Sequence, residues 1–342
     1  SRRGTVGADG QRLGSQYEGS YSPDGVLDPD AETVTFDYRE SALRGGAWLE
    51  AEAQLSRRVV AQAGLRADGA SDIGGVTLDP RLNVTVALSS STPLRLASGL
   101  YSQRPAVETV ALADRQLAPS RASHWVAGLL HESGGWTLRA EAYRKDYRDV
   151  VVERDGAVWS ADGQGRAQGL DLFARLADSP DRRWHGWVSY SLLSSERTQA
   201  RRLGDAVVLD RGPAPFAIRH ALNVVGKAEV ANRLVAGGRF RVSSGRPVTP
   251  VTGAVAPEGY WLPVEGRVGT DRLPAYIRLD ANLSYTLPVP GLGAVVMYGA
   301  VNNLLNRGNV VGRLYSPDYS AFEPDVTAYR RSVYAGVSLL LR

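Results

Sequence analysis

The chain alternates apolar and polar residues over many short stretches. In the clearest stretch, residues 43–56, Ala47, Leu49, Ala51, Ala53 and Leu55 alternate with Trp48, Glu50, Glu52, Gln54 and Ser56. Because successive side chains of a β-strand point to opposite faces, this pattern predicts a strand with one apolar and one polar face. The alternation recurs in residues 59–66, 82–88, 94–103, 136–145, 170–176, 276–285 and 333–342.

Short and long connections alternate between these stretches. The short ones fall at residues 56–57, 89–91, 133–135, 178–182, 231–232 and 288–293, and the long ones at 67–77, 104–121, 153–167, 196–218, 247–275 and 306–332. Transmembrane barrels have short periplasmic turns and longer extracellular loops. The sequence therefore predicts an all-β, antiparallel transmembrane β-barrel whose long connections lie outside the cell and whose last strand ends in the periplasm.

The alternation also predicts which side chains face the lipid. We expect Leu49, Ala51, Leu82, Val84, Val86, Leu170, Leu172, Leu279, Val337 and Leu339 to point outward. We expect Glu50, Glu52, Asn83, Asp171, Arg175, Asp280 and Asn282 to point into the lumen. A slip of one residue in strand register would reverse all of these faces.

The number of strands leaves the N-terminal segment open. About 13 strands follow residue 43, whereas single-chain bacterial barrels have an even number. Residues 33–38 alternate and are expected to extend the next strand, and residues 1–40 as a whole predict a loop-rich segment, either an extracellular loop or a partial strand. Because an open sheet leaves unpaired amides in lipid, residues 41–342 are interpreted as about 13–14 strands of a larger barrel.

Composition supports this class and argues against others. The chain has 37 glycines, 15 tyrosines, 7 tryptophans and no cysteine, and no apolar run reaches the ~18 residues of a transmembrane helix. Tryptophans and tyrosines near strand ends suit the aromatic girdles that contact outer-membrane lipid. The net charge of +4 is the small difference between 40 basic and 36 acidic residues. This mixture of charges indicates solvated loops and a solvated lumen, so no nucleic-acid partner is expected.

Nine short segments then suggest a family. They read GLRAD (64–68), LDPRLNV (78–84), LAPSRASH (117–124), EAYRKDY (141–147), QGLD (168–171), RHALN (219–223), SSGRP (243–247), RLD (278–280) and VNNLLN (301–306). In this order they resemble the β-barrel of TonB-dependent outer-membrane receptors, from about residue 43 to residue 342. The resemblance implies a barrel of the 22-stranded type and a location in the bacterial outer membrane.

The resemblance also implies a function and partners. Members import a scarce, bulky nutrient such as a ferric siderophore, cobalamin, an oligosaccharide or a peptide, and a periplasmic TonB-type protein supplies the energy by acting on a plug. Residues 1–40 resemble neither the plug nor its coupling segment, so no plug domain is recognisable. No covalent chemistry and no cofactor are implied, and the chain is not expected to be an enzyme.

Aromatic residues and arginines on the expected loops are the candidates for ligand capture. They offer large contact areas and bidentate polar contacts. The candidates are Tyr101, Arg104, Tyr143, Tyr147, Arg246, Tyr260, Trp261, Tyr315 and Tyr319. Each of them, taken alone, also fits ordinary loop packing, and Arg246 fits a charge at the lumen rim.

Two other classes of function remain open. A passive, unplugged pore would have the same wall, and a precursor that began with a strand instead of a plug would favour it. A barrel hydrolase would need a converging nucleophile, base and orienting group. The four histidines, His124, His131, His185 and His220, are expected on different strands and have no ligand spacing for a metal.

Overall fold

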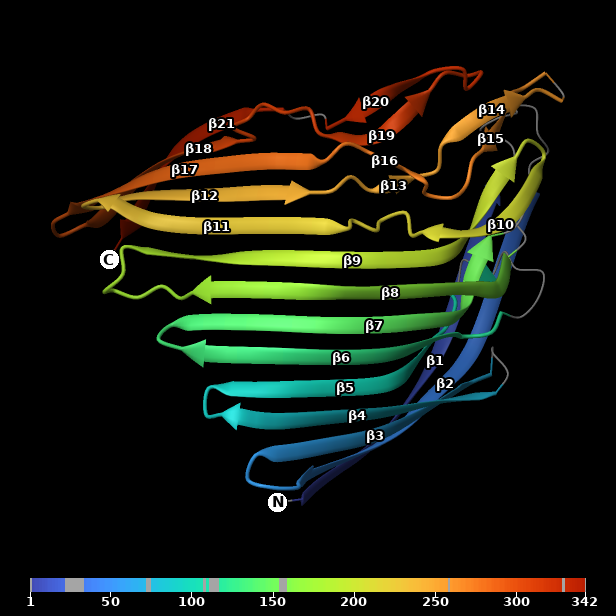
Figure 1. The fold of residues 1–342 in the computed structure, drawn as a ribbon, viewed down its shortest axis with the longest axis horizontal. Helices are drawn as coiled ribbons and strands as arrows, with labels where there is room; N and C mark the ends of the chain where they lie inside the picture. The colour runs from blue at the N-terminus through green and yellow to red at the C-terminus, as the bar shows by residue number, and fades with distance from the viewer. Residues whose placement is uncertain are drawn as a thin grey trace.

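The fold is a single curved antiparallel sheet. The computed structural model describes residues 2–21, 34–71, 75–106, 109–110, 117–153, 159–257, 259–327 and 330–341. In Figure 1 the long strands lie side by side, and smaller strands gather at one end of the sheet. A search of these described residues finds no helix that is long and apolar enough to cross a membrane.

Fourteen long strands form the wall within the described part of the chain. They are β1 (Arg2–Tyr21), β2 (Val34–Gln54), β3 (Val59–Ala70), β4 (Val76–Ser89), β5 (Thr92–Gln103), β6 (Ser120–Ser133), β7 (Trp136–Glu153), β8 (Trp159–Leu176), β9 (Trp184–Leu203), β11 (His220–Ala231), β12 (Leu234–Ser243), β17 (Tyr276–Val289), β18 (Gly293–Asn302) and β21 (Ser332–Leu341). Each pairs with the next in this order, so the prediction of 13–14 antiparallel strands is confirmed. Among the described residues, β1 and β21 each have one neighbour in the wall.

Seven shorter strands build the end of the molecule that carries the long connections. They are β10 (Ala206–Pro213), β13 (Pro247–Val248), β14 (Val251–Val255), β15 (Leu262–Glu265), β16 (Asp271–Arg272), β19 (Val310–Tyr315) and β20 (Phe322–Val326). Two predicted connections are shorter than expected, because β7 and β8 extend into residues 153–167 and β9 and β10 occupy most of residues 196–218. Those parts of the sequence are therefore strands that project beyond the wall.

The predicted grouping of short and long connections at opposite ends of the sheet is confirmed. The short turns between β2 and β3, β4 and β5, β6 and β7, and β8 and β9 all lie at the left end in Figure 1. Antiparallel pairing then places the connections at residues 104–121, 247–275 and 306–332 together at the opposite end. The last strand, β21, finishes at the short-turn end, where the C-terminus is marked in Figure 1.

The loop interpretation of the N-terminal segment is wrong for residues 2–21. These residues form β1, which pairs with β2 over its whole length. Glycine-rich composition suggested a loop, but Gly7 lies directly opposite Trp48, and a Cβ atom at Gly7 would lie 2.1 Å from the indole ring. The glycine makes room for the ring, which covers the bare backbone. The expected extension of the second strand through residue 38 is confirmed, since β2 begins at Val34.

The same arrangement recurs at two other positions of the wall. Gly169 lies opposite Tyr143, and Gly336 lies opposite Tyr298. A Cβ atom would come within 2.6 Å of the Tyr143 hydroxyl at the first site and within 2.4 Å of the Tyr298 hydroxyl at the second. An aromatic side chain that lies across a facing glycine shields the exposed strand and fixes its register.

The two faces of the wall differ in polarity as predicted. Strand register joins Val84, Leu96, Ala127 and Ala142 across four strands on the apolar face. All residues predicted to face outward share this face, and all residues predicted to face inward share the other, so the facing prediction is confirmed.

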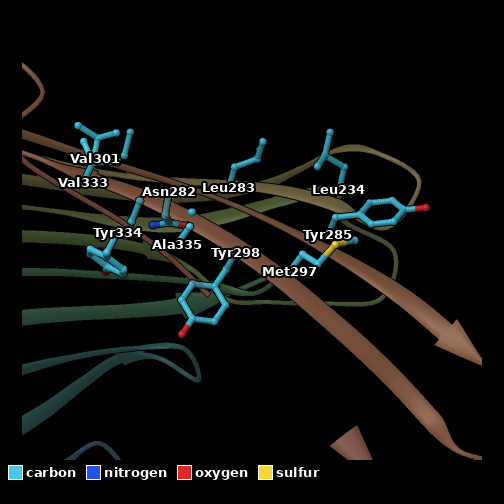
Figure 2. A pocket seen from close by; sticks show the side chains of 13 residues that line it. Leu234, Asn282, Leu283, Tyr285, Met297, Tyr298, Val301, Val333, Tyr334 and Ala335 are labelled. Carbon is cyan, nitrogen blue, oxygen red and sulfur yellow. The ribbon is translucent and has the colours of Figure 1, made fainter. Parts of the chain in front are cut away.

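The polar face is the inner one. Figure 2 shows Leu234, Leu283 and Val333 pointing away from the remaining strands, whereas Tyr298 and Tyr334 point toward them. The apolar face carries tryptophans at both ends: Trp136 and Trp184, whose ring centroids are 6.4 Å apart, lie near the short turns. Trp125 lies toward the long connections and is about half exposed. This apolar belt between aromatic girdles is typical of outer-membrane barrels.

Candidate ligand-binding site at the extracellular mouth

A cavity of about 410 Å³ lies inside the wall where β11, β12 and β17 leave the sheet. Asn223, Arg241 and Tyr276 contribute polar side chains from the inner face of these strands, and Val310 and Val311 of β19 line it as well. Within the described residues the Arg241 guanidinium makes no hydrogen bond or ion pair. The cavity therefore offers an unused positive charge beside amide and phenol groups.

A second cavity, of about 530 Å³, lies among the long connections. Its lining combines aromatic residues with charges of both signs: Phe216, Arg246, Glu265, Arg313, Tyr315 and Asp325. Arg246 lines both cavities. A ligand that moved from the connections toward the lumen would pass this side chain.

Arg246 is held by two contacts. Its Nη2 atom donates a hydrogen bond to the carbonyl oxygen of Val311, and its guanidinium lies 5.9 Å from the centroid of the Phe216 ring. The backbone around it is tightly packed, because a Cβ atom at Gly245 would lie only 1.6 Å from the carbonyl oxygen of Leu273. Only glycine fits at position 245, and this fit sets the path along which the chain leaves β12.

An ion pair joins the two longest connections. Arg313 of β19 pairs with Asp271 of β16, and the Arg313 guanidinium lies 4.5 Å from the centroid of the Phe322 ring. The hydrogen bond from Arg313 and a second one from the Arg272 backbone lower the pKa of Asp271 below its ordinary value. Because Asp271 is about half exposed, the pair contributes modestly to stability, and its main effect is to fix the positions of the two connections.

Two buried asparagines complete the framework of the mouth. Asn309 accepts a hydrogen bond from the Ile277 amide and donates one to the Ile277 carbonyl, as a neighbouring strand would. Asn303 has a left-handed φ of 49°, and its amide donates to Asp280 Oδ1 at 2.8 Å. Its side chain also donates to the carbonyl oxygens of Arg307 and Arg330. In the structure these asparagines therefore end strands and hold the connection beneath the cavities.

Three of the predicted site residues meet at the mouth. Arg246 and Tyr315 line the same cavity, and the rings of Tyr315 and Tyr319 lie 5.8 Å apart. The ring of Phe322 lies 5.6 Å from that of Tyr315. Tyr319 has a left-handed φ of 57°, which turns the chain at the tip of the β19–β20 hairpin.

Three other candidates lie in the lumen wall, and two of them, Tyr101 and Tyr147, meet at His124. Tyr101 belongs to β5 and Tyr143 and Tyr147 belong to β7, so the expectation that they lie on loops is wrong. His124 stacks on Tyr101 at 4.4 Å and meets the edge of Tyr147 at 6.3 Å. His124 and His131 both belong to β6, so the expectation that the histidines lie on different strands is wrong for this pair. The Arg81 guanidinium lies 4.6 Å from the centroid of the Tyr101 ring. The period-2 alternation that continues through residues 136–145 places Tyr143 on a strand.

The remaining candidates are not among the residues that line the two cavities. Arg104 directly follows β5, whereas Tyr260 and Trp261 lie between β14 and β15. Trp261 is 44% exposed and lines neither of the two cavities described above. Sequence reasoning missed Arg241 and Arg313. The inward position of Arg241 follows from strand alternation, but the partner of Arg313 could not be found without the fold.

The mouth is suited to holding a ligand rather than to bond chemistry. Guanidinium, phenol and amide groups surround two cavities of a size that accepts a bulky small molecule. Within the described ranges, no group of three or more histidine, cysteine, aspartate or glutamate side chains is placed to hold a metal ion.

Comparison with known proteins identifies the family to which this arrangement belongs. The family model "TonB dependent receptor-like, beta-barrel" matches residues 2–304. No curated protein sequence matches the chain.

Three solved structures share its fold. The ferric-catecholate import receptor Fiu from E. coli K12 has a TM-score of 0.68, 14% identity, and coverage of 98% of this chain and 52% of Fiu. The siderophore receptor PiuA from Acinetobacter baumannii gives 0.68, 14%, 98% and 53%, and the outer-membrane transporter YddB from Escherichia coli gives 0.70, 13%, 99% and 51%. The chain thus spans about half the length of these proteins.

The family match covers most of the wall and the greater part of the mouth. This family consists of receptors and transporters of the outer membrane, so the hydrolase alternative is excluded and the predicted location is confirmed. The chain belongs to the TonB-dependent receptor family and forms part of its outer-membrane β-barrel.

Proposed function

We propose that this chain forms the greater part of the wall and mouth of an importer for a scarce, bulky nutrient, with a ferric siderophore as the favoured ligand. Family membership and the siderophore receptors among the structural neighbours support this function. In this proposal further strands close the two open edges of the sheet, because lipid offers no hydrogen-bond partners to the backbone amides and carbonyls at those edges. A plug inside the lumen connects the barrel to the periplasmic TonB-type protein.

The observation that carries the proposal is the pair of cavities that share Arg246. The outer cavity offers Tyr315 and Phe216 to a large, partly apolar ligand, and the inner cavity offers the unpaired guanidinium of Arg241. Ferric complexes of catecholates and hydroxycarboxylates carry negative charge and planar groups. Guanidinium and aromatic side chains complement both features.

Titration of the purified protein with ligands tests the proposal. We expect quenching of tryptophan fluorescence by at least one ferric siderophore from a panel that includes ferric citrate, a ferric catecholate, cobalamin and maltohexaose. Replacing Arg241→Ala should weaken that binding by about tenfold or more, since hydrogen bonds to charged groups contribute about 1.5–3 kcal/mol.

Arg239→Ala is the matched control. Arg239 lies two residues earlier on β12, on the same inner face, but it is exposed and lines neither cavity of the mouth. Equal losses in the two variants would show that general charge, rather than the inner cavity, attracts the ligand. Binding of cobalamin or maltohexaose alone would contradict the siderophore assignment.

A transport assay separates import from passive flow. Cells that carry the protein with its native flanking sequence should take up the ligand in a saturable way that stops when the proton gradient is collapsed. A large, steady conductance in planar bilayers without energised uptake would support the unplugged pore instead.

A further inference from the structure

A shallow apolar groove lies on the outer face of β4, β5, β6 and β7, and its volume is about 550 Å³. The outward-pointing residues Leu82, Val84, Leu96 and Trp125 line it together with the small residues Ser98, Ala127 and Ala142. Because small side chains lie between large ones, the surface is hollowed along the strands. The groove belongs to the part of the apolar belt nearest the long connections.

Arginines begin where this groove ends. Arg144 lines the groove and lies opposite Trp125 on the outer face. Its Nε atom donates to Asp146 Oδ2 at 2.8 Å, and the Nε atom of Arg166 on β8 donates to Asp146 Oδ1 at 2.7 Å. One carboxylate thus lies between two guanidiniums, so the group retains a net positive charge. All three side chains are partly exposed.

Two further arginines lie on the side of this group that faces the long connections. Register places Arg121 of β6 opposite Arg148 of β7, on the same outer face as Arg144. Like charges at directly opposite positions destabilise a sheet unless an anion offsets them. Arg121 approaches Asp149 only to 4.0 Å, and in the described part of the chain Arg148 has no hydrogen-bond or ion-pair partner.

One further acid on the outer face pairs with a different arginine. Glu196 of β9 lies opposite Arg166, but its carboxylate is 3.8 Å from Arg211. Within the described residues, the ion pairs of the four arginines use two carboxylates, those of Asp146 and Asp149, which leaves an excess of two positive charges at the level where the aromatic girdle ends. Lipid headgroups occupy that level in an outer-membrane barrel.

We propose that this outer surface is a binding site for a lipid whose phosphate-bearing headgroup has a net negative charge, in the leaflet on the side of the long connections. An acyl chain lies in the groove over Ala127 and Ala142. The phosphate accepts hydrogen bonds from Arg144 and Arg148 and offsets the repulsion between Arg148 and Arg121. The site is separate from the ligand cavities, which lie on the inner face.

A second, uncharged groove shows that the arginines are what distinguish the proposed lipid site. The groove in Figure 2 has a volume of about 730 Å³ and lies along β17, β18 and β21, with Leu283, Met297 and Ala335 among its lining residues. None of the described residues that line it is charged. A lipid chain can occupy this second groove, but the surface provides no reason to prefer an anionic headgroup there.

Lipid binding to the purified protein tests the proposal. The protein is produced with its native flanking sequence in the outer membrane, purified in an uncharged detergent and titrated with phosphatidylglycerol or phosphatidylcholine, and bound lipid is counted by native mass spectrometry. We expect about tenfold tighter binding of the first phosphatidylglycerol, because basic side chains attract an anionic headgroup more strongly than a zwitterionic one. The Arg144→Gln, Arg148→Gln double variant should lose this preference, and the Arg144→Lys, Arg148→Lys variant should keep most of it.

Groove-filling variants separate the chain from the headgroup. Ala142→Trp should weaken binding of both lipids at this site, whereas Ala335→Trp in the second groove should leave the phosphatidylglycerol preference unchanged. Equal affinity for the two lipids in the unmodified protein would overturn the proposal. A preference that persists in the double glutamine variant, with its β-sheet circular dichroism intact, would overturn it as well.

Discussion

The wall and the mouth of this protein are stabilised in different ways. From β3 to β8 the strands are joined by long backbone ladders whose register shifts only near strand ends, and one apolar–polar alternation sets the side chains between these shifts. At the mouth the strands are as short as two residues, and single side-chain contacts such as Arg313–Asp271 hold the connections together. The stability of the wall should therefore depend on whether a mutation places a polar group in lipid. The stability of the mouth should depend on whether a mutation removes an individual contact.

The largest effect is expected in the wall. Val84 lies between Leu82 and Val86 on the outer face of β4, so Val84→Arg would bring a charge into the apolar belt. Near the bilayer midplane such a change costs about 2–4 kcal/mol, which should appear as a lower free energy of unfolding in lipid vesicles. Thr85→Arg is the control, because Thr85 faces the lumen. Equal costs for the two variants would show that the faces are assigned incorrectly.

The next effect concerns the backbone of the mouth. A Cβ atom in Gly245→Ala would collide with the Leu273 carbonyl, so the chain must move where it enters the inner cavity. We expect siderophore affinity to fall by about tenfold or more while the unfolding free energy of the wall changes little. Gly253→Ala in β14 is the control, since no atom lies within 4 Å of its added Cβ. A large loss of global stability in Gly245→Ala would remove the contrast between the regions.

A smaller effect should follow when the ion pair is removed. Arg313→Ala should lower the free energy of local opening at β16 and β19 by roughly 1 kcal/mol, measured as faster amide hydrogen exchange. Because the pKa of Asp271 is lowered in the folded state, its stabilisation is complete above the ordinary value of 3.8 and is lost as the pH falls through the lower folded value. Exchange at β6 and β7 should not change. Faster exchange throughout the wall would contradict this locality.

The smallest effect is expected at the tip of the β19–β20 hairpin. The hydroxyls of Ser316 and Ser320 donate to Asp318 at 2.7 and 2.8 Å, and with the Ser320 amide they lower the pKa of Asp318 to about 2. Asp318→Ala should change siderophore affinity by less than about threefold, as for other surface changes. In the unmodified protein this turn should loosen only as the pH falls through about 2. Its loosening near pH 5 would contradict this account.

The sequence predicted the wall more fully than the mouth. Alternation over residues 43–56 was sufficient to place Leu49 outward and Glu50 inward, because the period of a strand is fixed by backbone geometry. It failed for β1, where Gly7 looked like a loop residue. The reason that position 7 is glycine is Trp48, which lies on another strand. Such a reason becomes visible only when the partner strand is known.

Prediction of the site was limited in the same way. Arg246 and Tyr315 were chosen for their residue type, and the fold brings them to one cavity although 68 positions of sequence separate them. Tyr101 and Tyr147 were chosen by the same rule and lie in the lumen wall. Residue type indicates which side chains are able to bind. Which of them meet depends on long-range contacts such as the hydrogen bond from Arg246 to Val311.

The shortness of the turns at the other end has a mechanical consequence. The turn between β6 and β7 consists of Gly134 and Gly135, and that between β11 and β12 of Asn232 and Arg233. A periplasmic protein that pulled on the receptor would find few side chains on this rim to bind. A pull on material inside the lumen would be directed along the barrel axis, roughly parallel to the strands and across their hydrogen bonds, so that many bonds share the load at once. The wall would then keep its structure under the load, and the material inside the lumen would be the part that moves or unfolds.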